Sequence, residues 1–219
     1  MQIKVDLHVH SSYSRDSLIT PEELVFYAKK SGLDGVAITD HDRLDGALRM
    51  SKETEFFMIP GMEITSSDGH IVALRIKEPV PKGLGADETV ERIHEAGGLA
   101  VACHPFAFFK GSLGRHTSSK FDAIEVINAS AFPFGFSVKN ARRLASGLGI
   151  PQVGGTDAHY GPEIGCAYTV IDSELEVDRV IDAISSGKCE AFGKAIPWRL
   201  RLKKQFLMSK GNAGPENEK

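Results

Sequence analysis

Cysteine is scarce in this chain, and the three that occur, Cys103, Cys166 and Cys189, lie far apart and form no C-x-x-C pair. We therefore expect neither a disulfide framework nor a zinc site built from thiolates, and a reducing cytoplasm is the natural location. Long apolar runs are also absent. No stretch approaches the roughly 20 residues of a membrane-spanning helix. No apolar signal peptide follows Met1, so we expect no membrane association.

The sequence also lacks a large excess of positive or negative charge. It carries 26 Lys and Arg against 29 Asp and Glu, for a net charge of -3. This balance gives no electrostatic reason to expect a nucleic-acid coat or an anionic membrane surface as the partner. A nucleic-acid partner is therefore possible but not favoured, and the sequence leaves the oligomeric state open.

Internal repeats and Pro- or Ser-rich linkers are missing too, which makes one domain the simpler count. Hydrophobic residues make up 42% of the 219 residues, enough for a full core. We place the domain at residues 1–208. Residues 209–219, which are mostly Gly, Asn, Pro, Glu and Lys, are expected to form a disordered tail.

Short apolar runs alternate with amphipathic helical stretches along most of the chain. Strands are expected at residues 3–7, 35–39, 56–59 leading into 62–65, 70–76, 99–102, 123–127, 151–153 and 166–171. Helices are expected near 20–31, 47–52, 87–96, 137–146 and 173–184, and the pairs Thr20 with Glu23 and Ser173 with Glu176 resemble capping boxes. This alternation predicts an α/β fold with a parallel sheet, either open or closed into a barrel. The basic segment 198–207 is expected to pack outside the domain, and its role stays open.

The stretch from Asp6 to Asp16 carries the first chemical signal. Alternation along a short strand places Asp6, His8 and His10 on one face at its end. Two imidazoles and a carboxylate make a poor core, but they are good ligands for divalent Zn, Mn or Fe. A His-x-His pair alone is weak evidence, so the prediction depends on ligands from elsewhere in the chain.

Later strand ends supply such ligands. His41, Glu63, His104 and the pair Asp157 and His159 follow expected strands, while His70 begins a strand across a tight turn from Glu63. Barrels of this class carry their chemistry at the C-terminal ends of their strands. Six of the eight histidines belong to this set, and His94 and His116 are expected to be solvated. Together with Asp16, nine ligands are too many for one ion. They suit two or three ions about 3.5–4 Å apart, with Glu63 as the candidate bridge.

At this point the sequence resembles the PHP family of metal-dependent phosphoesterases, the polymerase and histidinol phosphatase domain. The motifs that carry the resemblance span most of the chain in the family's order: residues 6–10 with Asp16, 38–41, 60–63, 69–71, 103–105 and 155–159. A PHP-associated C-terminal part is expected at about residues 155–208. The resemblance implies a distorted, seven-stranded (β/α)7 TIM-like barrel with the metal site at the C-terminal ends of the strands.

The resemblance also implies roles for single residues. The first metal would be held by His8, His10, Glu63 and Asp157, the second by Glu63, His70 and His104, and the third by Asp16, His41 and His159. Two or three ions of Mn, Fe or Zn would activate a hydroxide held by Glu63, Asp157 and His159. Lys110 and Arg115 are candidates for phosphate binding, with Arg15 as a weaker one, and a solvated basic loop is an equal alternative. Asn128 could bind substrate or fix a loop.

The predicted function is hydrolysis of a small phosphorylated metabolite or nucleotide. Phosphatases of the nucleotide-bisphosphate type carry a long helical insertion between the regions that match His70 and His104, and that interval is short here, so the substrate stays open. A 5'-3' exonuclease and an amidohydrolase-type metallohydrolase are alternatives. A non-catalytic RNA-binding subunit, as in ribonuclease P, ranks low because every ligand position is filled.

Overall fold

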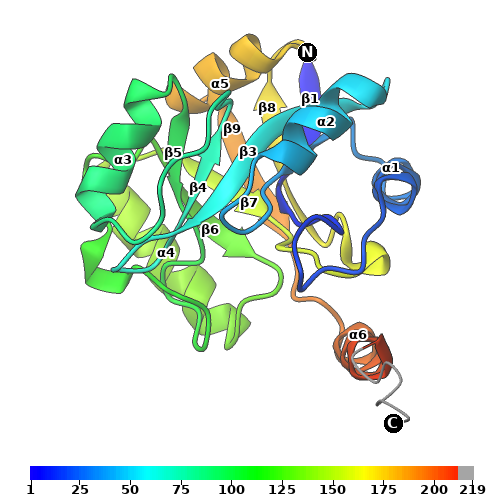
Figure 1. Cartoon of the computed structure of the whole chain (residues 1–219). Coiled ribbons are helices and arrows are strands. Elements are labelled where there is room, and N and C mark those ends of the chain that lie inside the picture. The colour runs from blue at the N-terminus through cyan, green and yellow to red at the C-terminus, as the bar shows by residue number, and fades with distance from the viewer. Residues whose placement is uncertain (212–219) are drawn as a thin grey trace, which may run out of the picture.

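The structure, a computed structural model, describes the backbone of residues 1–211 and side chains as far as Ser209. Strands and helices alternate along the chain (Figure 1). The strands are β1 (Gln2–Val9), β2 (Gly35–Ile38), β3 (Phe57–Thr65), β4 (His70–Leu74), β5 (Leu99–Ala102), β6 (Ala123–Asn128), β7 (Gln152–Gly155), β8 (Ala167–Asp172) and β9 (Cys189–Gly193). The helices are α1 (Pro21–Lys30), α2 (Asp45–Glu53), α3 (Ala86–Glu95), α4 (Phe134–Leu148), α5 (Val177–Ser185) and α6 (Trp198–Gly211).

All nine strands join one curled sheet in the order β7-β6-β5-β4-β3-β2-β1-β8-β9. The sheet nearly closes where β7 reaches β1, because the amide of Asp157 donates to the carbonyl of His8 at 2.7 Å and Val9 bridges Ala158. A mixed α/β, barrel-like fold is therefore present. The predicted count of seven strands and the wholly parallel sheet are wrong, since β4, β8 and β9 run antiparallel to their neighbours.

Two features of the strands differ from the sequence expectation for local reasons: strand β9 was not expected, and β3 continues through Pro60-Gly61. The edge strand β9 was missed because only Ala191 of its five residues is buried, so its sequence lacks an apolar run. Pro60-Gly61 does not interrupt β3: Gly61 leaves room for the carbonyl of Ala73, which would lie 2.5 Å from an added Cβ.

The two predicted capping boxes had different outcomes. The box at α1 is confirmed, because Thr20 Oγ1 accepts from the Glu23 amide at 3.2 Å and the Glu23 carboxylate accepts from the Thr20 amide at 3.3 Å. The box with Ser173 is wrong. Helix α5 starts later, with Glu176 as a cap that makes no side-chain bond, and the Ser173 hydroxyl donates to the carbonyl of Glu174 instead.

Two apolar clusters hold the fold together. One packs the outer faces of the strands against the helices and includes Leu24 and Val36. The other lies inside the barrel, where Val5, Leu7 and Ile59 meet Val180 of α5. Figure 1 shows α5 beside the start of β1, so this helix covers the end of the barrel where β1 begins. The opposite end is left for polar side chains.

An irregularity in strand β1 changes which side chains face that polar end. The pairing of β1 with β2 shifts between Asp6 and Val9, as at a β-bulge. Asp6 therefore does not lie on the face that carries His8 and His10. The prediction that all three residues share one face is wrong. Its buried carboxylate accepts from the amides of Thr156 at 2.8 Å and Gly165 at 3.1 Å. Burial raises the pKa of Asp6 to about 6, although the bonds from Thr156 lower it.

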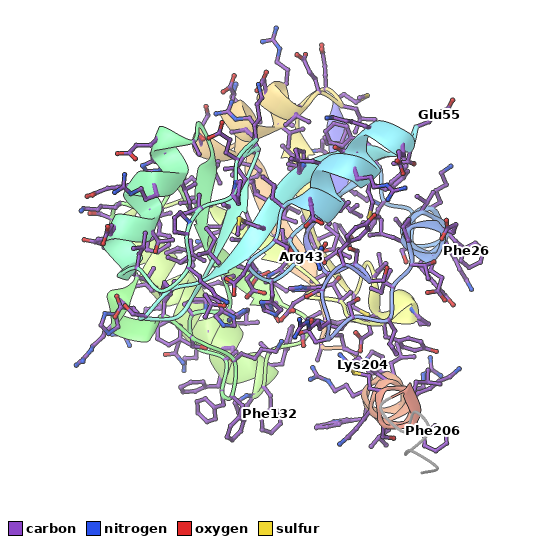
Figure 2. All side chains as sticks on the ribbon, in the orientation of Figure 1. Phe26, Arg43, Glu55, Phe132, Lys204 and Phe206 are labelled. Carbon is purple, nitrogen blue, oxygen red and sulfur yellow. The ribbon has the colours of Figure 1, made fainter. Side chains whose placement is uncertain are left out.

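Helix α6 lies outside the barrel, as predicted for its basic segment (Figure 1). The Arg201 guanidinium donates to the carbonyls of Ala129 and Ser130, each at 3.0 Å, and Figure 2 shows Lys204 on the side of α6 that faces the barrel. The helix continues to Gly211, beyond the predicted domain end at 208. The rest of the expected disordered tail, residues 212–219, lies outside the described residues. No described helix is long and apolar enough to cross a membrane.

Candidate metal centre

The nine predicted ligands come together at the polar end of the barrel. His8 lies in β1 and His10 directly after it, His41 follows β2, Glu63 lies in β3, His104 follows β5, Asp157 and His159 follow β7, and Asp16 lies in the loop after β1. His70 reaches the same place because β4 is antiparallel to β3. It pairs with Thr65, so the start of β4 lies beside the end of β3.

Glu63 occupies the middle of this cluster. Its Oε1 lies 2.9 Å from both His70 Nδ1 and His104 Nε2. Its Oε2 lies 3.2–3.3 Å from His8 Nε2, His10 Nε2 and His41 Nδ1. One buried carboxylate therefore contacts five imidazoles, which is the geometry that a bridging ligand requires.

Asp157 is the second buried carboxylate. Its Oδ1 lies 3.4 Å from His10 Nε2 and 3.5 Å from His159 Nδ1, and its Oδ2 accepts a short bond from the ammonium group of Lys110. Asp157 and His104 both adopt positive φ angles, 55° and 33°, which cost non-glycine residues roughly 1–2 kcal/mol each. Such strain where strands end is typical of functional sites.

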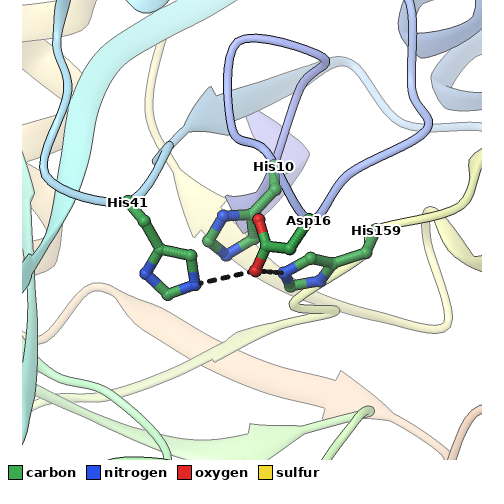
Figure 3. A group of neighbouring side chains, drawn as sticks. All are labelled: His10, Asp16, His41 and His159. Carbon is green, nitrogen blue, oxygen red and sulfur yellow. Dashed lines mark hydrogen bonds and ion pairs between the residues drawn. The ribbon is translucent and has the colours of Figure 1, made fainter. Parts of the chain in front are cut away.

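Asp16 completes the exposed side of the cluster. Figure 3 shows its carboxylate between two imidazoles, 3.3 Å from His41 Nε2 and 3.2 Å from His159 Nε2, with His10 beside them. The Asp16 side chain is 47% exposed, whereas His8, His10 and Glu63 are almost completely buried. The centre therefore has a closed inner part and an open outer part.

Charge and burial compete in the inner part. Burial alone would raise the pKa of Glu63, but the imidazoles, His8 first, outweigh it and hold that pKa well below its usual range. Burial would lower the pKa of His10, yet its contacts with Asp157 and Glu63 raise it to about 9. Burial and the neighbouring His10 lower the pKa of His159 to about 4. A bound cation would compete with protons for the ring nitrogens of His8 and His10.

Several inner atoms have no hydrogen-bond partner in the described part of the chain. They include His8 Nε2, both ring nitrogens of His10, His104 Nδ1 and Glu63 Oε2. His8 Nε2 and His10 Nε2 lie 3.3 and 3.2 Å from Glu63 Oε2, but not with the geometry of hydrogen bonds. Buried polar groups without partners are costly, and a cation shared by His8 Nε2, His10 Nε2 and Glu63 Oε2 would supply a partner for these three atoms. The donor set of imidazoles and carboxylates fits divalent transition metals.

The ligand atoms fall into overlapping groups, in each of which all atoms lie within 4.8 Å of one another. The groups are His10, Asp16, His41 and His159; His8, His10 and Glu63; His8, His104 and Asp157; His41, Glu63 and His70; and Glu63, Cys103 and His104. The first contains the third metal's expected ligands with His10 added. Glu63 belongs to three groups. The geometry therefore suits more than one ion, and it does not reproduce the implied partition residue by residue.

Glu125 is a buried partner of the cluster that the sequence reasoning missed. Its carboxylate lies 3.1 Å from His8 Nδ1 and accepts from the His104 amide at 2.8 Å and from Asn128 Nδ2 at 2.9 Å. A carboxylate on the far nitrogen of a ligating histidine fixes the ring and raises its basicity. The signal was present, since Glu125 is the one charged residue of an otherwise apolar expected strand.

Glu163 was also passed over, because nothing in its local sequence marks it. It is fully buried and accepts from the amides of His159 at 3.0 Å and Tyr160 at 3.2 Å. The ammonium group of Lys204 in α6 lies 3.0 Å from it. Glu163 thus links helix α6 to the loop that carries His159.

The four candidates for phosphate binding lie in different surroundings. Lys110 lines the cavity over the centre, with its side chain 26% exposed. Asn128 is buried and donates to Glu125 and, at 3.3 Å, to Asp157, which places it in the support of the cluster. Arg15 and Arg115 are exposed, and neither lines that cavity.

Two glycines allow the Lys110 loop to approach the centre. Gly69 has a φ of +145°, and an added Cβ would lie 2.8 Å from the carbonyl of Gly111. At Gly111 an added Cβ would lie 2.5 Å from the His70 ring. The His70 amide donates to the Gly111 carbonyl at 2.6 Å, so the loop is fixed against the β3–β4 turn.

Comparison with known proteins identifies the family. Residues 137–189 match the family model described as PHP-associated. The chain is 38% identical over 141 residues to uncharacterized protein MJ1587 of Methanocaldococcus jannaschii, which covers 58% of this chain and 82% of that protein. The fold matches a two-domain protein of Bacteroides vulgatus containing a predicted PHP-like metal-dependent phosphoesterase, with a TM-score of 0.73 and 18% identity. The chain belongs to the PHP family.

That structural match covers 95% of this PHP chain and 70% of the Bacteroides vulgatus chain. A shorter match links the chain to the 5'-3' exoribonuclease of Haemophilus influenzae, with 38% identity over 89 residues. It covers 37% of this chain and 32% of that enzyme. The PHP-associated family model and the PHP-like structural match confirm the resemblance to the PHP family that the motifs carry.

We expect Glu125→Gln to weaken metal binding by about 10- to 100-fold, because the amide cannot hold His8 as a carboxylate does. Titration of chelator-stripped protein with Mn²⁺, in competition with a chromophoric chelator, measures the affinity. Asp122→Asn is the matched control, since Asp122 pairs at 2.8 Å with His94 outside the centre. Its affinity should equal that of the wild type. Unchanged affinity in Glu125→Gln would contradict the role given to Glu125.

Proposed function

We propose that this PHP protein is a metal-dependent phosphoesterase that hydrolyses a phosphorylated metabolite or nucleotide. The observation that carries the proposal is the buried cluster of imidazoles around Glu63, with inner atoms that lack hydrogen-bond partners. His8, His10, Asp16, His41, Glu63, His70, His104, Asp157 and His159 would hold two or three ions of Mn, Fe or Zn. When bound, such ions lower the pKa of water and neutralise charge on phosphoryl oxygens.

The chain's own residues add positioning and charge. Lys110 places an ammonium group at the cavity beside Asp157, where it can donate to a phosphate oxygen. His159, whose pKa is lowered to about 4 by burial and by His10, is neutral at pH 7 and can act as a ligand. Glu63, Asp157 and His159 together would orient the attacking water.

Two other classes of function have weaker support. An amidohydrolase could use the same kind of centre, but it has no need for the ammonium group of Lys110 at the cavity. A non-catalytic RNA-binding subunit would not need the nine ligands to meet. The 5'-3' exoribonuclease among the relatives supports phosphoester chemistry and keeps nucleic acid among the candidate substrates.

We expect protein loaded with Mn²⁺ to hydrolyse p-nitrophenyl phosphate. His8→Ala or Asp157→Ala should lower kcat/KM by more than about 100-fold, because losing a metal ligand costs more than the roughly 10- to 100-fold lost with a residue that only supports a ligand. Orthovanadate should inhibit the wild type. Circular dichroism should show that both variants stay folded, and Asp182→Ala, an exposed carboxylate on α5, is the control with full activity. Turnover at the wild-type rate in His8→Ala and Asp157→Ala would reject the ligand assignment.

We expect Lys110→Ala to raise KM for the same phosphomonoester by about 10-fold or more, since a bond to a charged group contributes about 1.5–3 kcal/mol. Initial rates over a range of substrate concentrations measure the change. Arg115→Ala, which removes an exposed cation from the same loop, should leave KM unaltered. An unchanged KM in Lys110→Ala would contradict the role proposed for Lys110, and a higher KM in Arg115→Ala would assign that role to Arg115.

A further inference from the structure

The cavity over the metal centre is smaller than most pockets that enclose a whole ligand. Its volume is about 230 Å³, and its lining includes Asp16, His159 and Lys110. Pockets that enclose a whole drug-sized ligand usually measure about 300–1,000 Å³. We therefore expect a substrate larger than this cavity to extend onto the surface around it.

Five exposed aromatic side chains begin at this cavity and continue to α6. We call them the aromatic surface: Phe109, Phe108, Phe136, Phe132 and Trp198. Their exposed fractions run from 46% for Phe132 to 95% for Phe109, and Phe109 lines the cavity. Figure 2 shows Phe132 at the outer edge of the molecule. Large apolar side chains that gather on a surface mark an interaction site more often than scattered ones do.

The aromatic surface is continuous. The Phe108 ring lies 6.3 Å from that of Phe109 and 5.6 Å from that of Phe136, both edge to face. The Phe108 amide donates to the carbonyl of Phe132 at 2.7 Å, and the Phe132 ring lies 6.1 Å from Trp198. The rings thus form a chain with one end at the metal centre, which suits a linear ligand anchored there.

The segments that carry these rings hold basic residues and no acidic ones. Residues 104–120, 129–156 and 194–211 contain twelve Lys and Arg and no Asp or Glu, although the whole chain has 29 acidic residues. Lys139 and Arg199 are exposed near Phe136 and Trp198 in the sequence, and the Arg201 guanidinium lies 5.6 Å from the Trp198 ring. These segments are therefore positive in a chain whose net charge is -3, which favours a polyanion.

We propose that the aromatic surface binds single-stranded nucleic acid, with bases stacked on the rings and a terminal phosphate in the cavity. The proposal rests on the phosphoesterase function for the cavity end and adds the substrate class. Every base has a flat face that can stack on an aromatic ring, and exposed basic side chains such as Lys139 and Arg199 can pair with the phosphates of the backbone. A duplex keeps its bases paired and cannot use the rings in this way.

The test uses the full chain and a ten-nucleotide oligouridine with a 5'-phosphate and a 3'-fluorescein. Fluorescence anisotropy in EDTA measures binding without turnover. Loss of one stacking ring lowers affinity by about 5- to 100-fold, so Phe136→Ala and Trp198→Ala should each weaken binding to that extent. Trp198→Phe keeps an aromatic ring and should restore most of the affinity.

Phe26→Ala is the matched control. Phe26 is 58% exposed on α1, has Lys30 5.6 Å from its ring, and lies far from Phe132 in Figure 2. This variant should bind the oligonucleotide like the wild type. Equal binding by all variants would overturn the proposal, and so would equally effective competition by a duplex or by phosphatidylserine vesicles. A dimer in sedimentation that Trp198→Ala dissociates would assign the surface to a second copy instead.

Separate measurement of p-nitrophenyl phosphate turnover keeps the two proposals distinguishable. Oligonucleotide binding that depends on Trp198 and Phe136, without any turnover, would reject the phosphoesterase and keep the aromatic surface. Turnover by a protein that does not bind the oligonucleotide would reject the aromatic surface alone.

Discussion

The contact between one buried carboxylate and five imidazoles is the constraint on which this structure depends. Glu63 has His70 and His104 at 2.9 Å on one oxygen and three further imidazoles at 3.2–3.3 Å on the other. So many polar groups away from water are costly unless each has a partner. The fold gathers these groups by closing one end of the sheet with apolar side chains, so that strand ends from the whole chain meet at the other end. A bound cation would supply partners that the described residues do not provide.

Much of this cluster could be predicted because its residues have local signals in the sequence. His8 and His10 stand at a strand end, and the tight turn between Glu63 and His70 is visible in Ser67-Asp68-Gly69. The position of Asp6 could not be predicted, since a shift in strand pairing depends on the neighbouring strand. Glu163 is similar: its partners, the His159 amide and Lys204 of α6, meet it only in the folded chain.

Helix α6 connects the surroundings of the cluster to the aromatic surface. Lys204 and Arg201 attach α6 to Glu163 and to the carbonyls that follow Asn128, so the helix is held by loops that contact the cluster around Glu63. The same helix carries Trp198 at the far end of the aromatic surface. A substrate on this surface would therefore contact elements that are tied to His159 and Asp157. Where the substrate lies along the surface would then affect where its phosphate lies in the cavity.

The most direct test of the central claim is to count the ions that the cluster binds. Chelator-stripped protein would be saturated with Mn²⁺ or Zn²⁺, and metal content and Tm would be measured together. At least two equivalents are expected. Each site occupied at 100 times its Kd adds about 2.7 kcal/mol of stability, so Tm should rise by roughly 5–10 °C per site. Less than one equivalent with an unchanged Tm would contradict a metal centre around Glu63.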